Sequence, residues 1–276
     1  EMHRHDTSIE VLTDAIIRYA VERVRLDPPP LDHPRSPEAL AALTGPTITP
    51  EGLGGLKALQ LFSDVLAPAC LSVDHPRFLS FVPAAPTEAS ILFDLIVGAS
   101  SIYAGSWMEG AGAVHAENEA LRYVADLAGF PESAGGVFVS GGTAGNLSAL
   151  IAARWRWRQR ANGRHDRTRG LIVSSTGAHS SVAAAARAMD CDTLLIPADE
   201  RGGLRTPALD SALASLPPDE LDRIIAIVTT AGTTNSGVVD DLAGVAAACE
   251  RLGTWMHVDG AYGGAGLAAP SVRALY

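Results

Sequence analysis

Lysine is nearly absent from this sequence: Lys57 is the only one among 276 residues, although arginine is plentiful. Cysteine is also scarce. Cys70, Cys191 and Cys249 lie far apart and form no CxxC pair, which argues against a zinc ribbon or a redox dithiol. An odd number of cysteines at low density is typical of a reducing compartment, so we expect a cytoplasmic protein.

Long apolar runs and excess positive charge are missing too. No run is long enough to span a bilayer, and residues 1–10 lack the apolar core of a signal peptide. The net charge of −10 and the pI near 5.2 disfavour binding to nucleic acid or to an anionic membrane. His3 and His5 form an HxH pair close to the terminus, where fraying is common, and we assign no metal site.

The chain has ample material for a large core, because 47% of its residues are hydrophobic. Residues 8–26 have apolar side chains at helical spacing, with Ser8 as the expected N-cap. A proline-rich link follows at 27–37, and a second helix is predicted at 53–68. We interpret residues 1–74 as a helical arm that buries its apolar stripe on a larger body or on a second subunit.

From about residue 75, short β-rich runs alternate with helical stretches. The sequence predicts strands at 136–140, 171–175, 193–197, 224–230 and 254–259. It predicts helices at 86–100, 113–129, 145–160, 180–189, 207–216 and 241–252. This alternation predicts an α/β domain over 75–276, with a mainly parallel sheet flanked by helices and strands buried on both faces. Such a domain would normally extend beyond Tyr276, so we expect the fold to continue.

Glycines follow the first predicted strand, in the run GGTAGN at 141–146 that opens a helix. Glycine allows close approach of the backbone, and free N–H groups at a helix start attract an anion such as phosphate. The spacing matches neither the dinucleotide fingerprint nor a Walker loop. A glycine-rich turn without a ligand is the alternative.

Three other predicted strands end in polar residues, and ligands of such sheets bind at the carboxyl ends of the strands. His179 follows the second strand and could stack on a planar ring or move a proton, or simply cap a helix. Thr234 lies in the loop after the fourth strand, which could equally be an ordinary polar turn. Asp259 ends the fifth strand, where a buried carboxylate needs a cationic partner, either a protonated pyridine nitrogen or an arginine. Together these signals indicate a pyridoxal-phosphate (PLP) site.

Five segments carry a resemblance to the group II PLP-dependent decarboxylases, which act on aromatic amino acids, glutamate or diaminobutyrate. In order, they are HPRFLSFVPAAPT (75–87), GVFVSGGTAGNLSAL (136–150), AHSSV (178–182), TTAGTTNSGVVDDL (229–242) and HVDGAYGG (257–264). The resemblance implies the aspartate-aminotransferase-like fold, PLP fold type I, preceded by a helical arm. It also implies a homodimer with shared active sites and a small amino-acid substrate.

The resemblance also implies roles for individual residues. Asp259 would stabilise the positive charge on the PLP ring nitrogen, and His179 would stack on the ring and help return a proton to Cα. The other implied contacts are phosphate binding by Gly142 and Thr143, ring contacts by Thr234 and Ala261, and a substrate pocket formed by Phe81, Val82 and Pro83.

This sequence departs from the family pattern in two ways. The family's PLP-binding lysine follows the aspartate motif, but no lysine lies between Asp259 and Tyr276, and Lys57 matches no motif. Gly105 stands where aromatic-specific members tend to carry phenylalanine, and Ala84 where they carry a hydroxyl residue. We expect decarboxylation of an L-amino acid, aromatic rather than acidic or diamino, provided that a further part of the protein supplies the lysine.

Two alternatives stay open at this point. The chain could be another fold-type-I PLP enzyme, such as a lyase or desulfurase, or a non-catalytic PLP-binding fragment or pseudoenzyme. The basic stretch 154–169 contains Trp155 and Trp157, a composition that can bind single-stranded nucleic acid. We interpret it instead as an exposed helix end whose tryptophans pack on the domain, because the whole chain is acidic.

Overall fold

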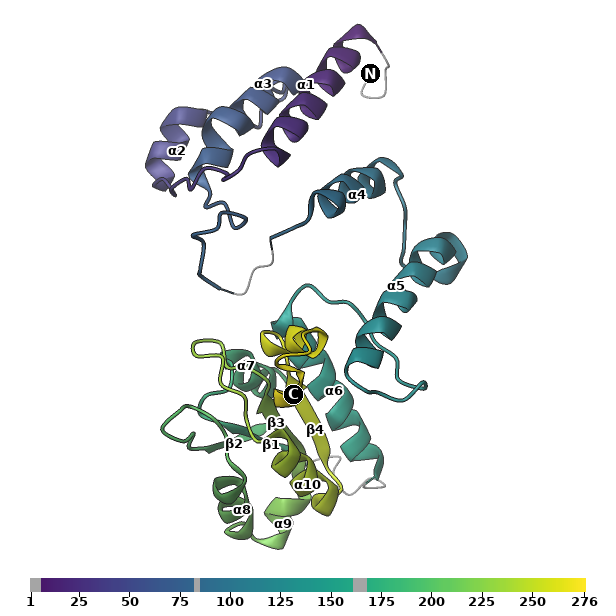
Figure 1. Ribbon diagram of the computed structural model, residues 1–276, viewed down its shortest axis with the longest axis vertical. Coiled ribbons are helices and arrows are strands. Elements are labelled where there is room, and N and C mark those ends of the chain that lie inside the picture. The colour runs from purple at the N-terminus through teal and green to yellow at the C-terminus, as the bar shows by residue number, and fades with distance from the viewer. Residues whose placement is uncertain (1–5, 82–84, 161–167) are drawn as a thin grey trace. The chain divides into compact units, whose positions relative to one another are not determined.

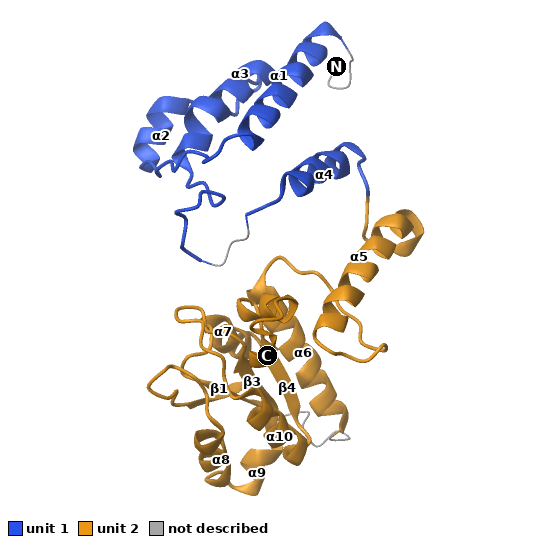
Figure 2. Cartoon of the chain, viewed as in Figure 1, with its two compact units in different colours: residues 1–102 blue, residues 103–276 orange. Residues whose placement is uncertain are grey.

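The computed structural model describes residues 6–81, 85–160 and 168–276 (Figure 1). The chain forms two compact units, residues 1–102 and residues 103–276 (Figure 2). The boundary that we predict after residue 74 stays a prediction. None of the helices in the described ranges is both long and apolar enough to cross a membrane.

The first unit is helical, as predicted for the arm. Asp6 caps its first helix, in place of the predicted Ser8: the Asp6 carboxylate accepts the Ser8 N–H at 2.9 Å, so the cap lies two residues before the predicted one and the helix begins at Thr7. The helix at Pro37–Thr44 is not among the predicted helices, although Ser36 followed by Pro37 is a helix-start signal. The α-helices are α1 (Thr7–Val24), α2 (Pro37–Thr44), α3 (Gly55–Leu61) and α4 (Glu88–Ala99).

The helix predicted at 53–68 changes type along its length. After α3 the chain continues as a π-helix at Phe62–Leu66 and a 3-10 turn at Ala67–Ala69. Pro68 explains the end of this segment, because proline has no N–H to donate to the preceding turn. The helix predicted at 86–100 is confirmed as α4.

The second unit contains a four-stranded parallel sheet with the order β2-β1-β3-β4. Four predicted strands are confirmed as β1 (Leu171–Ser175), β2 (Asp192–Ile196), β3 (Ile224–Thr230) and β4 (Trp255–Asp259). The short helix α9 (Pro218–Asp222) is not among the predicted helices. The helices are α5 (Trp107–Leu127), α6 (Gly142–Arg160), α7 (Ser180–Ala188), α8 (Thr206–Ala214), α9 (Pro218–Asp222) and α10 (Leu242–Leu252). Two 3-10 turns follow, at Gly263–Ala268 and Arg273–Leu275.

The strand predicted at 136–140 is wrong, because no strand of the described sheet pairs with this segment. Its apolar side chains are exposed, with Val137 at 66% and Phe138 at 57%. The prediction that all strands are buried on both faces holds for β1 and β3 only. Strands β2 and β4 lie at the two edges of the sheet, where each pairs with one strand among the described residues, and both contain exposed residues.

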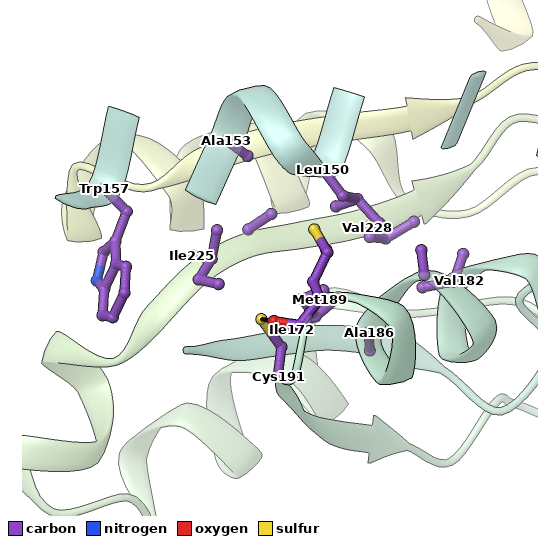
Figure 3. Close-up of a cluster of buried hydrophobic side chains, with 12 residues drawn as sticks. Leu150, Ala153, Trp157, Ile172, Val182, Ala186, Met189, Cys191, Ile225 and Val228 are labelled. Atoms are coloured by element: carbon purple, nitrogen blue, oxygen red, sulfur yellow. Dashed lines mark hydrogen bonds between the residues drawn. The ribbon is translucent and has the colours of Figure 1, made fainter. Parts of the chain in front are cut away.

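Helices cover both faces of the sheet, as the strand–helix alternation predicts. On one face, Leu150 from α6 and Val182 from α7 pack against Ile172 and Val228 of the sheet (Figure 3). On the other face, α8 and α10 bury Leu209 and Val245 against strands β1 and β3. The first of these cores fixes the positions of α6 and α7, whose N-termini lie at the carboxyl ends of the strands.

Truncation of Ile227 tests this core. Its side chain is fully buried on β3, in the cluster shared with α8 and α10. We expect Ile227→Ala to lower the free energy of unfolding by about 2–5 kcal/mol, because it removes buried methyl groups and leaves a cavity. Chemical denaturation monitored by circular dichroism measures this loss. A change under about 0.5 kcal/mol, typical of surface sites, would contradict the packing described.

The basic stretch at 154–169 divides into packed and exposed parts. Trp157 is 9% exposed and belongs to the core, and its Nε1–H donates to the carbonyl of Asp222 at 2.8 Å. The Arg156 guanidinium lies 5.9 Å from the ring centre of Trp255. The predicted packing of the tryptophans is therefore confirmed for Trp157 and wrong for Trp155, which is 65% exposed. Residues 161–167 lie outside the described residues.

Candidate active site

The N-terminus of α6 is the first element of the site. Helix α6 begins at Gly142, three residues before the predicted start, so Gly142 and Thr143 belong to its first turn. Gly141 has a φ of 147°, a backbone conformation that favours glycine, and its carbonyl accepts the Gly145 N–H at 3.0 Å. The first N–H groups of a helix have no partner within the helix, so this turn presents exposed donors suited to an anion.

Ala261 lies beside this turn, although it is 119 residues away in sequence (261 − 142). A Cβ atom built at Gly142 would lie 3.1 Å from the Cβ of Ala261, so the two backbones approach closely because Gly142 has no side chain. The fold therefore brings the predicted phosphate loop and the residues after β4 to the same place.

His179 is the N-cap of α7, so the capping role left open by the sequence is confirmed. Its Nδ1 accepts the backbone N–H of Ser181 at 3.2 Å and lies 2.8 Å from the hydroxyl of Ser181. Within the described part of the chain, Nε2 of the same ring has no hydrogen-bond partner. Capping uses one ring nitrogen and leaves the other available to a ligand.

His179 lines a groove of about 390 Å³ between the loop after β1 and the loop after β3. Thr234 lies on the opposite wall and is exposed. Its neighbour Thr233 is buried and bonds within the loop, to the Ser236 hydroxyl at 2.9 Å and the Val238 N–H at 3.1 Å. The fold thus brings the predicted residues His179 and Thr234 together around one groove.

Asp259 is buried at the carboxyl end of β4, with 8% of its surface exposed. Its Oδ2 accepts from Nδ2 of Asn146 at 2.9 Å, and its Oδ1 accepts the Ala261 N–H at 3.2 Å. None of the salt bridges within the described residues involves Asp259, so the arginine partner considered above is not found there. A buried carboxylate that lacks a cation is costly, which makes Asp259 well suited to a cationic ligand.

Three residues that the sequence did not single out connect these groups. Asn146 donates to both Asp259 and the Ser181 hydroxyl, each at 2.9 Å, and its Oδ1 lies 2.7 Å from Nε2 of His257. Two signals could have revealed two of these residues. His257 precedes Asp259 by two residues on one strand and so shares its face, and Asn146 lies four residues after Gly142 on one helix.

His257 adds a pH dependence to this network. Burial lowers its pKa below the usual 6.5, and the nearby charge of Asp259 opposes this only in part. The unfolded chain therefore binds a proton at a pH where the folded chain does not. We expect the free energy of unfolding to fall as the pH drops from 6.5 through the folded pKa.

Comparison of denaturation curves at several pH values for wild type and His257→Gln measures this effect. The Gln variant keeps an N–H donor for Asn146 but does not titrate, so its stability should lose this component of the pH dependence. Identical pH dependence in the two proteins would contradict the assignment to His257.

The Asp240 carboxylate and the Thr230 hydroxyl, both near the end of β3, differ in their hydrogen bonds. Burial raises the pKa of Asp240, whose carboxylate accepts the N–H groups of Leu204 at 2.6 Å and Thr230 at 2.7 Å, so its role is structural. The adjacent Asp241 caps α10. In contrast, the buried Thr230 hydroxyl has no partner within the described residues, and Thr230 pairs with Asp259 in the β3–β4 register. A polar ligand at this rim would satisfy it.

The predicted substrate pocket is largely outside what the structure describes. Phe81 is 91% exposed in the first unit with a φ of 60°, and its ring centre lies 6.5 Å from that of Phe78. Val82 and Pro83 lie outside the described residues. In the second unit, a Cβ built at Gly105 would lie 2.3 Å from the Tyr103 hydroxyl, so the Tyr103 phenol occupies the space beside Gly105.

The chain is similar to known proteins over most of its length. A family model described as the pyridoxal-dependent decarboxylase conserved domain matches residues 37–276. The chain is 32% identical to an aromatic-L-amino-acid decarboxylase of Bacillus atrophaeus over 194 residues, which is 69% of this chain and 39% of that protein. It is also 32% identical to an L-2,4-diaminobutyrate decarboxylase of Rhizobium meliloti (strain 1021) over 196 residues, 70% of this chain and 38% of that protein.

Solved structures show the same fold. Mouse CSAD superposes with a TM-score of 0.87 at 23% identity, covering 99% of this chain and 58% of that one. Oryza sativa TDC, crystallised with PLP and tryptamine, superposes with a TM-score of 0.81 at 23% identity, covering 98% of this chain and 57% of that one. These structures confirm the predicted fold type I class.

The chain spans about two fifths of the length of these two curated relatives. The family model nevertheless matches 240 of its 276 residues (276 − 37 + 1) and includes every element of the described site. The chain therefore belongs to the family of pyridoxal-dependent decarboxylases.

Proposed function

We propose that the protein decarboxylates an L-amino acid to an amine and CO2 with PLP as cofactor, using a PLP-binding lysine from outside residues 1–276. The observation that carries this proposal is Asp259. It is a buried carboxylate without a cationic partner among the described residues. It lies at the carboxyl ends of the strands, where the N-termini of α6 and α7 also lie. A protonated pyridine nitrogen is a cation of suitable size and flat shape.

The residues at the carboxyl ends of the strands fit the phosphate and the ring of PLP. The exposed first turn of α6, with Gly142 and Thr143, suits the dianionic phosphate, and the Thr143 hydroxyl adds a donor. The small side chain of Ala261 leaves room for a flat ring close to that turn. His179 and Thr234 line the neighbouring groove of about 390 Å³, from which they would contact the ring.

When bound, PLP supplies an electron sink that stabilises the negative charge left on Cα as CO2 departs. Asp259 holds the ring nitrogen in its protonated, cationic form by Coulomb attraction, which maintains that sink. Its carboxylate is held at both oxygens, by Asn146 and by the Ala261 N–H. His179 has a ring nitrogen available in the groove to return a proton to Cα.

The substrate class is part of the proposal, and we favour an aromatic amino acid. Similarity to the Bacillus atrophaeus enzyme supports this choice, while equal identity to the Rhizobium meliloti diaminobutyrate enzyme keeps the diamino substrate as the main competitor. Tyr103 provides an aromatic side chain beside Gly105, at the place where aromatic-specific members tend to carry phenylalanine.

We further propose a cytoplasmic homodimer. Helix α1 buries none of its residues within the described chain, and apolar side chains such as Ile9, Ile16 and Val21 are exposed. An amphipathic helix of this kind is stabilised by packing on another surface. All three cysteines are free, which agrees with a reducing compartment.

Product analysis of the full-length protein tests the function. Purified protein with PLP is incubated with L-tryptophan, L-tyrosine, L-2,4-diaminobutyrate and L-glutamate, and both CO2 and the amine are quantified. We expect equimolar CO2 and amine from an aromatic amino acid. Equal or faster release from diaminobutyrate would overturn the substrate choice alone. Absence of both products, or products of another lyase reaction, would overturn the proposed function.

A further inference from the structure

Asn146 is the centre of the hydrogen-bond network described above, and its partners fix its orientation. The Asp259 carboxylate can only accept hydrogen bonds, so the Asn146 group that faces it at 2.9 Å must be the NH2 group. The second hydrogen of that group then points to the Ser181 hydroxyl oxygen, also at 2.9 Å. The Asn146 Oδ1 can only accept, so Nε2 of His257 carries a hydrogen and donates it at 2.7 Å.

Ser181 links Asn146 to His179 through its hydroxyl group. Because its oxygen accepts from Asn146, its single hydroxyl hydrogen is free to donate to Nδ1 of His179 at 2.8 Å. The backbone N–H of Ser181 points at the same nitrogen, at 3.2 Å. Two donors therefore face Nδ1, which must be the unprotonated nitrogen of a neutral imidazole. The hydrogen of that imidazole is on Nε2.

We propose that Asn146 is a positioning residue that orients the Asp259 carboxylate and, through Ser181, sets the tautomer and ring orientation of His179. The consequence is that Nε2–H is the group with which His179 contacts the ligand or exchanges a proton. Asn146 is 4% exposed and Ser181 is 3% exposed, so solvent offers them few competing partners. His257 is partly exposed. Low exposure strengthens such a network when every member is satisfied.

This inference rests on the proposed function for the nature of the ligand, but its main test needs no turnover. The full-length protein with PLP is prepared with 15N-labelled histidine rings, and His179 is identified by the signals lost in His179→Asn. We expect an unprotonated Nδ1 and a protonated Nε2. A protonated Nδ1 with an unprotonated Nε2 in the wild type would overturn the proposal.

Ser181 variants test the link between Asn146 and His179. Ser181→Ala removes the hydroxyl and keeps the backbone N–H, so we expect a measurable population of the Nδ1–H tautomer and about a tenfold lower kcat, the lower end of what loss of an orienting partner causes. Ser181→Thr keeps the hydroxyl and should restore both readouts. An unchanged tautomer and unchanged kcat in Ser181→Ala would overturn the link.

A double-mutant cycle then places Asn146 in the same chain of contacts. Asn146→Leu removes both amide donors, and its loss in kcat combined with that of Ser181→Ala should be smaller than the product of the two separate losses. Fully multiplicative losses would contradict coupling through Ser181. If the wild type forms neither CO2 nor amine but shows the predicted tautomer and its response to Ser181→Ala, the proposed function fails and the network assignment stands.

Discussion

Replacing Asp259 by alanine should lower kcat for decarboxylation by the full-length protein by about 10²–10³-fold, the range found when one preorganised electrostatic contact is removed from an active site. The carboxylate is buried and held by Asn146 and the Ala261 N–H, so no other acidic group among the described network can replace it. Without it, the ring nitrogen loses the negative charge that keeps it protonated, and the electron sink weakens. Steady-state kinetics with saturating PLP measure the effect.

Two companion variants make this result specific. Asp259→Asn keeps the shape but loses the charge, and its NH2 group would face the NH2 group of Asn146, so we expect a comparable loss. Asp210→Asn removes one negative charge from the exposed surface of α8, where Asp210 pairs with Arg251, and should leave kcat unchanged. Retention of kcat within about threefold in both Asp259 variants would refute the role given to this carboxylate.

The second large effect concerns His179. The variant His179→Asn should reduce kcat by about 10²–10⁴-fold, the usual contribution of a positioned proton-transfer group. Asparagine has a side-chain oxygen that can accept the Ser181 N–H in place of Nδ1, so the cap of α7 should survive. The ring and its available Nε2 are lost. Kinetics and thermal denaturation of the same preparation separate the two roles.

His179→Ala provides the matched comparison, because it removes both the ring and the cap. We expect the same loss of kcat as in His179→Asn, together with a loss of about 1 kcal/mol in stability from the missing cap. If His179→Asn retained wild-type kcat and only His179→Ala lost it, His179 would act through helix capping alone. That outcome would remove the proton-transfer role from the account.

Much of the second unit could be predicted from the sequence because its signals are local. The apolar runs predicted as strands at 171–175 and 224–230 coincide with the observed bounds of β1 and β3, the two central strands of the sheet. The segment 136–140 has the same composition, but composition alone does not supply a partner strand, and the described sheet contains none for it. Strand pairing depends on residues far away in sequence, which a local pattern does not encode.

The candidate site shows the same division. His179, Thr234 and Asp259 could be found because each lies at the carboxyl end of a strand of the parallel sheet or in the loop that follows it. Ser181 is a buried helix residue with no special local signal, and Asn146 is marked only by its spacing from Gly142 on one helix. The role of both depends on α6 and α7 packing on the same face of the sheet, which brings together side chains separated by 35 and 113 residues of sequence.

The most direct test of the account is a crystal structure of the full-length protein with PLP. We predict that the ring nitrogen lies within hydrogen-bond distance of the Asp259 carboxylate. The phosphate should contact the first turn of α6 at Gly142 and Thr143, and His179 should lie against the ring. PLP bound elsewhere, or bound with its ring nitrogen away from Asp259, would contradict the central claim that this edge of the sheet is the cofactor site.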